Sequence, residues 1–172
     1  GATYNVAVSG MVGSGTVIAA IPAGVAQDAS SNTNTASTST DNTVLYGLTA
    51  PAVTINQAIG QADPTNISPI NFIVVFSKPV TGFTNTDVAL SGTAGATIVA
   101  VTGNGANYNV AVSGMGGPGT VIATIPAGVA QDSTGNGNTP SSSTDNSVLY
   151  DVTPPTVTIN QAAAQADPTN TS

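Results

Sequence analysis

Short stretches in which apolar and polar residues alternate, separated by Gly, Pro, Asn and Asp, run through the whole chain. Such alternation over about four to eight residues is typical of β-strands, and no segment shows the periodicity of an amphipathic helix. The pattern therefore predicts an all-β protein. In the central part of the chain it predicts strands at 53–57, 70–77, 87–91, 97–101, 108–113, 120–125 and 147–152.

Alternation also assigns the two faces of each strand, because successive side chains point to opposite sides of a sheet. The side chains expected to point inward are Phe72, Val74, Phe76, Tyr108, Val110, Val112, Val121, Ala123, Ile125, Val148 and Tyr150. Burying a side chain of this size contributes roughly 1.5–3 kcal/mol, so about a dozen of them can sustain a domain without disulfides. Seven short strands within about 100 residues predict an immunoglobulin-like antiparallel β-sandwich.

A second apolar set falls on the outward faces of these strands and consists of Ile73, Val75, Ile122 and Leu149. One interpretation is that they are scattered surface aliphatics, which are normal on a soluble domain. The other is that they form an apolar assembly face for lateral packing between subunits.

The end of the chain repeats its beginning at an offset of 104 residues. GANYNVAVSGM at 105–115 follows GATYNVAVSGM at 1–11, and IPAGVAQD occurs at both 21–28 and 125–132. Of the 68 positions that align at this offset, 50 are identical. A period of this length indicates tandem repeats of whole domains.

The repeat predicts three parts. Residues 51–153 are expected to be a complete immunoglobulin-like unit, 1–50 the C-terminal half of a preceding unit, and 154–172 the first strand of a following one. The half-unit lacks partners for its apolar faces and is not expected to fold alone. We therefore expect an excerpt of a longer chain, or a subunit that its neighbours complete.

Lys78 is the only basic residue, against eight Asp and no Glu, which leaves a net charge of −7. This charge argues against nucleic acid and anionic membrane surfaces as partners. No apolar run reaches the ~18 residues that a membrane span requires. The chain has no His and no Cys, so His-based triads and thiol nucleophiles are excluded and no enzyme is expected.

The Asp residues suggest a calcium site. The stretch 132–138 offers closely spaced hard oxygen donors, and Asp63, Asp145 and Asp151 lie near the unit boundary. Calcium takes six to eight oxygen ligands, several of them carboxylates. Alternatively, the Asp and Asn side chains cap these turns themselves. Gly47 stands in the first copy where Asp151 stands in the second, which favours the capping interpretation.

Three surface features complete the sequence-based picture. The stretch 131–146, rich in Ser, Thr, Asn and Gly, is expected to be an irregular surface loop. Asn66 and Asn170 begin N-glycosylation sequons at the same repeat position. Lys78, at a strand end beside Pro79, is expected to be a solvated surface charge, with a covalent Lys–Asn bond as the alternative.

The segments NFIVVFSKPVTGFTNTDVALSG (71–92) and IPAGVAQDSTGNGNT (125–139), with the junction at 151–155, resemble bacterial immunoglobulin-like (Big-type) repeats. These repeats occur in tandem in large extracellular adhesins and surface repeat proteins. The resemblance covers the complete unit and both fragments, and it implies a β-sandwich that serves as a spacer or assembly unit. In some relatives calcium stiffens the domain junctions, and the residues here that match such a site are Asp132, Asn136 and Asp151.

These observations predict a structural, non-enzymatic module that is extracellular or located at the cell surface. Its expected partners are copies of itself, packed laterally or head to tail. One route is strand donation, in which Val157–Gln161 completes a sandwich in a neighbouring subunit. The alternative is an adhesin module that binds surface glycans or a host protein through its loops. That alternative requires exposed aromatics, and only Phe83 looks available.

Overall fold

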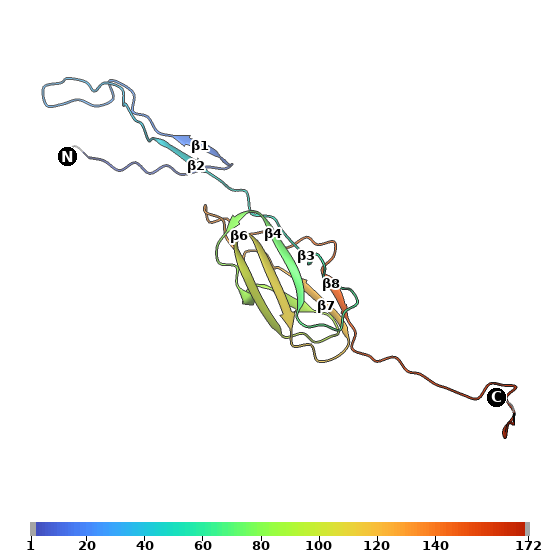
Figure 1. The fold of residues 1–172 in the computed structure, drawn as a ribbon. Helices are drawn as coiled ribbons and strands as arrows, with labels where there is room; N and C mark the ends of the chain where they lie inside the picture. Colours follow the sequence, from blue (N-terminus) through green and yellow to red (C-terminus); the bar gives the residue numbers. More distant parts are fainter. Residues whose placement is uncertain (1–2, 171–172) are drawn as a thin grey trace.

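The structure is a computed structural model that describes residues 3–170, and its regular elements are almost entirely β-strands (Figure 1). The only helical element in this range is the short 3-10 turn η1 (Asn85–Asp87). Accordingly, the described residues contain no helix long and apolar enough to cross a membrane. The strands are β1 (Gly15–Ile18), β2 (Thr43–Tyr46), β3 (Val53–Gln57), β4 (Ile70–Val80), β5 (Ala89–Ser91), β6 (Ile98–Ser113), β7 (Gly119–Thr124) and β8 (Ser147–Tyr150). The all-β prediction is confirmed.

The central part of the chain, residues 53–150, is a β-sandwich-like unit that we call the central sandwich. One sheet has the strand order β3-β4-β6, the other has the order β5-β7-β8, and all neighbouring strands are antiparallel. Side chains from both sheets meet in one buried cluster. Every side chain expected to point inward belongs to this cluster except Tyr150, which is half-buried and packs against it.

Strand β4 is longer than its sequence suggests. It continues through Pro79 to Val80, whereas the expected strand ended at Ser77. Proline cannot donate a ladder hydrogen bond, so it is tolerated where strand pairing is irregular. The register between β4 and β6 shifts between Val75 and Val80, and Pro79 lies within that shift.

Strand β6 folds back on itself, and its two arms are the strands expected at 97–101 and 108–113. The chain reverses at Gly103 and Gly105, whose φ angles of +118° and +65° are unfavourable for other residues. The arms approach so closely that a Cβ on Gly103 would lie 2.5 Å from the carbonyl oxygen of Asn107.

Strand β5 begins later than the strand expected at 87–91, because η1 occupies the residues before it. The Asp87 carboxylate accepts hydrogen bonds from the amide and the hydroxyl of Thr84, both at 2.7 Å. This local pairing favours a turn over a strand at Asp87, as expected for an Asp side chain that competes with the sheet ladder.

Three aromatic rings close one end of the core. Phe76, Phe83 and Tyr108 contact one another edge to face, with centroids 5.1–5.9 Å apart. The Tyr108 hydroxyl donates to the carbonyl oxygen of Val80. Phe83 is only 7% exposed, so the expectation that its ring is available to a ligand was wrong. The ring is buried because the chain after β4 turns it back against two other aromatic side chains.

The N-terminal segment, residues 3–46, contains a β-hairpin that lies outside the central sandwich (Figure 1). β1 pairs with β2 in the same register as β7 with β8, at an offset of 104 residues: Gly15 is opposite Tyr46, as Gly119 is opposite Tyr150. The tail, residues 151–170, leaves the opposite end of the sandwich and forms no strand.

Candidate functional site: a polar clamp on the linker

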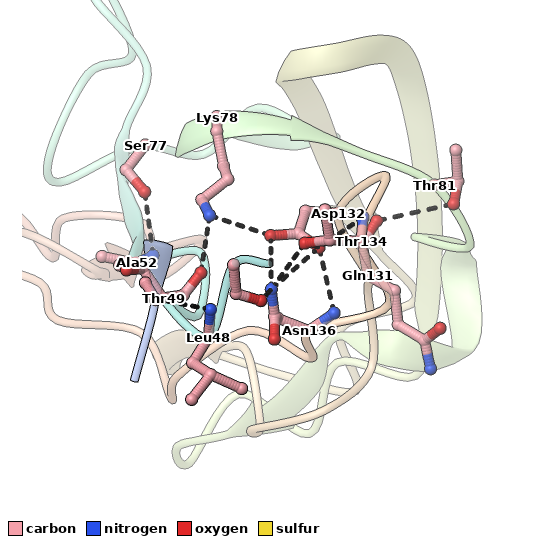
Figure 2. Close-up of polar contacts among 12 residues, drawn as sticks. Leu48, Thr49, Ala52, Ser77, Lys78, Thr81, Gln131, Asp132, Thr134 and Asn136 are labelled. Carbon is pink, nitrogen blue, oxygen red and sulfur yellow. Dashed lines mark hydrogen bonds and ion pairs between the residues drawn. The ribbon is translucent and has the colours of Figure 1, made fainter. Parts of the chain in front are cut away.

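Two polar side chains of the central sandwich, both bonded to a third, hold the linker, residues 47–52, that connects the sandwich to the N-terminal segment (Figure 2). We call Lys78, Asp132 and Asn136 the clamp. The Lys78 ammonium donates to the carbonyl oxygen of Thr49 at 2.5 Å and to Asp132 Oδ2 at 2.8 Å. The side-chain Nδ2 of Asn136 donates to the carbonyl oxygen of Gly47 at 3.0 Å.

The clamp is built on two elements that local sequence determines. Lys78 lies near the end of β4. Asp132 starts a tight turn in which its Oδ1 accepts the backbone amides of Thr134 and Asn136, at 3.0 and 2.9 Å. Gly135 takes a φ of +82° in this turn, which glycine adopts without strain. Asp and Asn favour such turns because their side chains bond to nearby backbone amides.

The electrostatics of the clamp depend on one ion pair. The Asp132 side chain is 4% exposed and that of Lys78 is 34% exposed. The hydrogen bond from Lys78 lowers the pKa of Asp132 well below its usual range; burial opposes this effect, and bonds from Asn136 and Thr134 add to it. Asp132 therefore stays ionised at neutral pH. Lys78 is not the solvated surface charge that was expected, because β4 directs its ammonium group toward the linker.

The linker is held at two further points. Ala52 forms a pair of hydrogen bonds with Ser77, whose amide donates to Ala52 O at 2.8 Å and whose hydroxyl accepts from Ala52 N at 3.0 Å. The amide of Leu48 donates to the Ser14 hydroxyl of the N-terminal segment at 2.7 Å. Backbone groups that a flexible linker would leave to water thus bond to both neighbouring parts of the chain.

A second copy of the Asp132 turn lies in the N-terminal segment. Asp28 Oδ1 accepts the amides of Ser30 and Asn32, both at 2.9 Å, and the pKa of Asp28 is lowered by bonds from Asn32. Ser31 holds a positive φ of 67° where the sister turn has glycine. Asp28 has no basic partner, because the chain's only base is Lys78.

The three residues proposed as calcium ligands do not come together. Asp132 and Asn136 lie in the clamp, whereas Asp151 is at the opposite end of the sandwich, where its amide donates to Thr65 O at 2.8 Å. The Asp151 carboxylate accepts the amide of Thr153 at 2.9 Å. Within residues 3–170, no three acidic, His or Cys side chains gather in an arrangement suited to a metal ion.

The proposed assembly face is divided between the two sheets. Ile73 and Val75 lie on the outer side of β4, whereas Ile122 and Leu149 lie on β7 and β8 of the other sheet. Since the two sheets face each other across the core, their outer sides point in opposite directions. The four residues therefore do not form one continuous patch.

Both sequon asparagines are exposed to solvent. Asn66 follows Thr65, whose amide donates to Leu149 O at 2.9 Å, so this sequon begins beside the last strand of the sandwich. Asn170 is at the end of the described chain, and the Thr171 and Ser172 of its sequon lie outside the described residues.

The stretch 131–146 is more ordered than the sequence-based expectation of a surface loop. Asn138 is 3% exposed, and its side chain bonds to Ala130 N, Pro126 O and Thr139 O. The signal that indicates this role is the preservation of Asp and Asn at 132, 136 and 138 in a stretch where neighbouring positions differ between the two copies.

No family model matches the chain, and no curated protein or solved structure matches it either.

Proposed function

We propose that this chain is a structural, non-enzymatic part of an array of immunoglobulin-like units, in which the clamp keeps consecutive units in a fixed orientation. The observation that carries this proposal is the set of hydrogen bonds that Lys78 and Asn136 make to the linker backbone. These bonds bridge parts of the chain that are distant in sequence. They leave the linker few free rotations, as a spacer that transmits force or sets a distance requires.

The chemistry of the site supports a scaffold. The clamp contains one carboxylate, one amide and one ammonium group, all engaged with each other or with backbone. A nucleophile with an adjacent base would have an unengaged polar group facing a cleft. An extracellular or cell-surface location is the setting we propose for such an array, with copies of the chain as its partners.

The repeated register supports the array. β1–β2 and β7–β8 pair in the same register, and in both turns the Asp Oδ1 accepts the backbone amides two and four residues further on. A contact between two consecutive units can therefore form again between any other two units that carry the same residues.

The proposal is tested by measuring the distance between two spin labels, one on each side of the linker. Val12 and Ile59 are each 98% exposed, so cysteines at these positions carry labels without disturbing the fold, and the chain has no other cysteine. We expect a narrow distance distribution, which Asp132→Asn broadens. Asp41→Asn, which removes the same charge at an exposed position, leaves it narrow. A distribution that is already broad in the parent chain contradicts the proposal.

A further inference from the structure

The N-terminal segment carries an uncovered apolar groove. Val6, Val8 and Val44 are 74%, 52% and 66% exposed. Together with Met11, Val17, Ala19 and Tyr46 they form the apolar lining of a groove with a volume of about 370 Å³, to which Asp41 and Asn42 add polar groups. Their counterparts 104 residues later, Val110, Val112 and Val148, are fully buried in the central sandwich. The central sandwich therefore shows which strands cover an apolar face that has the same residues as this groove.

Part of that cover is β3, and a second copy of β3 lies uncovered in the tail. VTINQ occurs at 53–57 and again at 157–161. Val157 and Ile159 are 92% and 95% exposed, whereas Val53 and Ile55 are 2% and 0% exposed.

The tail also has the local turn that follows β3. The side-chain Nε2 of Gln161 donates to Gln165 O at 2.6 Å, as the side-chain Nε2 of Gln57 donates to Gln61 O at 2.5 Å. This turn is already in place, so binding has to order only the strand that precedes it.

The central sandwich supplies the register for such binding. One edge of β3 bonds to β4, and the other edge bonds to the segment 139–145. Across that second edge, Thr139 N donates to Pro51 O at 2.9 Å and Ser142 N donates to Val53 O at 3.0 Å. Thr54 and Ser142 face each other in a parallel bridge. All of these contacts are made by backbone atoms, so they depend little on side-chain identity.

Shifted by 104 residues, these contacts join the tail of one molecule to the N-terminal segment of another. The acceptors become Pro155 O and Val157 O, and the donors become Thr35 N and Thr38 N. Asn32, the counterpart of Asn136, is then placed to hold the backbone of residue 151 as Asn136 holds Gly47.

We propose that the tail of one copy, residues 151–167, binds in the groove of the N-terminal segment of a second copy. The contact is head to tail, so a pair of molecules keeps one unused groove and one unused tail, and the assembly can grow as an open chain. This inference extends the proposed function by naming the partner and the surface that it uses.

Disulfide trapping tests the register. Thr38 and Thr158 correspond to the bridged pair Ser142 and Thr54, whose spacing suits a disulfide. We expect a chain with Thr38→Cys and a chain with Thr158→Cys to form a mixed disulfide dimer under mild oxidation. Val12→Cys, which is exposed but outside the groove, is the matched control. Cross-linking of Thr158→Cys to this control with equal yield overturns the proposal.

A second variant tests the apolar contact. Val157→Asp/Ile159→Asp changes two side chains that are almost fully exposed in the monomer, so folding is unaffected. We expect it to reduce self-association in sedimentation experiments by about tenfold or more, because the groove would have to bury unpaired carboxylates. Val12→Asp is expected to have no effect. Parent chain that stays monomeric at all concentrations, or association that survives the double substitution, overturns the inference. The spin-label distances, measured within dilute monomers, would still test the proposed function separately.

Discussion

The N-terminal segment and the second half of the central sandwich have nearly the same sequence, and they differ in what surrounds them. Val110 and Val112 are fully buried, whereas their counterparts Val6 and Val8 are 74% and 52% exposed. β1 and β2 nonetheless pair in the register of β7 and β8, whereas residues 3–9, the counterparts of the second arm of β6, form no strand. The two-stranded pairing thus forms within each segment, and burial depends on packing against β3, β4 and β5.

The two Asp turns also have the same local structure and different surroundings. Asp28 and Asp132 each accept backbone amides within their own turns. Only Asp132 also accepts a hydrogen bond from Lys78, which in turn holds the linker. The local sequence therefore forms this turn in both regions. Only the turn at Asp132 becomes part of the clamp, because β4 places Lys78 beside it.

We expect the two regions to differ most in how much stability they lose when a charged residue replaces a valine of the apolar face. Val148→Asp would bury an unpaired carboxylate, which destabilises a domain by more than about 4 kcal/mol, and we expect the sandwich not to fold. Val44→Asp changes the 66% exposed counterpart and should shift stability by at most about 0.5 kcal/mol. Thermal unfolding followed by circular dichroism measures both. Equal effects would mean that the N-terminal face is covered in solution.

A smaller difference is expected at the loop asparagines. Asn138 is 3% exposed, and its side chain bonds to three backbone groups. Asn34 makes corresponding bonds in the exposed N-terminal segment. Asn138→Ala leaves buried backbone groups unpaired and should lower the free energy of unfolding by about 1–3 kcal/mol. The groups that Asn34→Ala releases can bond to water, so we expect a smaller change. Urea denaturation compares the two, and a larger effect at Asn34 would contradict this account.

The ion pair of the clamp should make stability depend on pH. The pKa of Asp132 is lower in the folded protein than its usual value of about 4, so the unfolded chain binds more protons in the interval between them. The stabilisation is complete above about pH 4 and is lost as the pH falls toward the folded-state pKa. We expect Asp132→Asn to be less stable than the parent at pH 7 and to approach it in acid. Asp28→Asn, which lacks a basic partner, should show a weaker dependence. If the difference in free energy of unfolding between Asp132→Asn and the parent chain is the same at every pH, Asp132 is not the cause of the pH dependence.

The smallest effect is expected from removing divalent metal. Lys78 already supplies a positive charge to Asp132, and Asp151 lies at the other end of the sandwich. We therefore expect the melting temperature to be unchanged when a chelator is added. A fall that calcium reverses, and that Asp132→Asn abolishes, would show that a metal binds in the clamp after all.

Much of the fold could be predicted from alternation alone. The inward side chains of β4, β7 and the second arm of β6 were identified correctly, because a half-buried strand has a period of two. Pro79 was misleading, since the sequence does not show where strand pairing is irregular. Phe83 was misleading as well, since a ring after a strand looks free until the turn that follows brings it onto other rings.

The sequence by itself determined most of the strands and the Asp turns, because these depend on residues that are close together in the chain. Only the tertiary structure decided that Lys78 meets Asp132, 54 positions away, and that Lys78 also holds the linker. It also decided that one of two nearly identical apolar faces is buried and the other is open. Contacts of this kind depend on which strands pack against each other, and no local pattern records that.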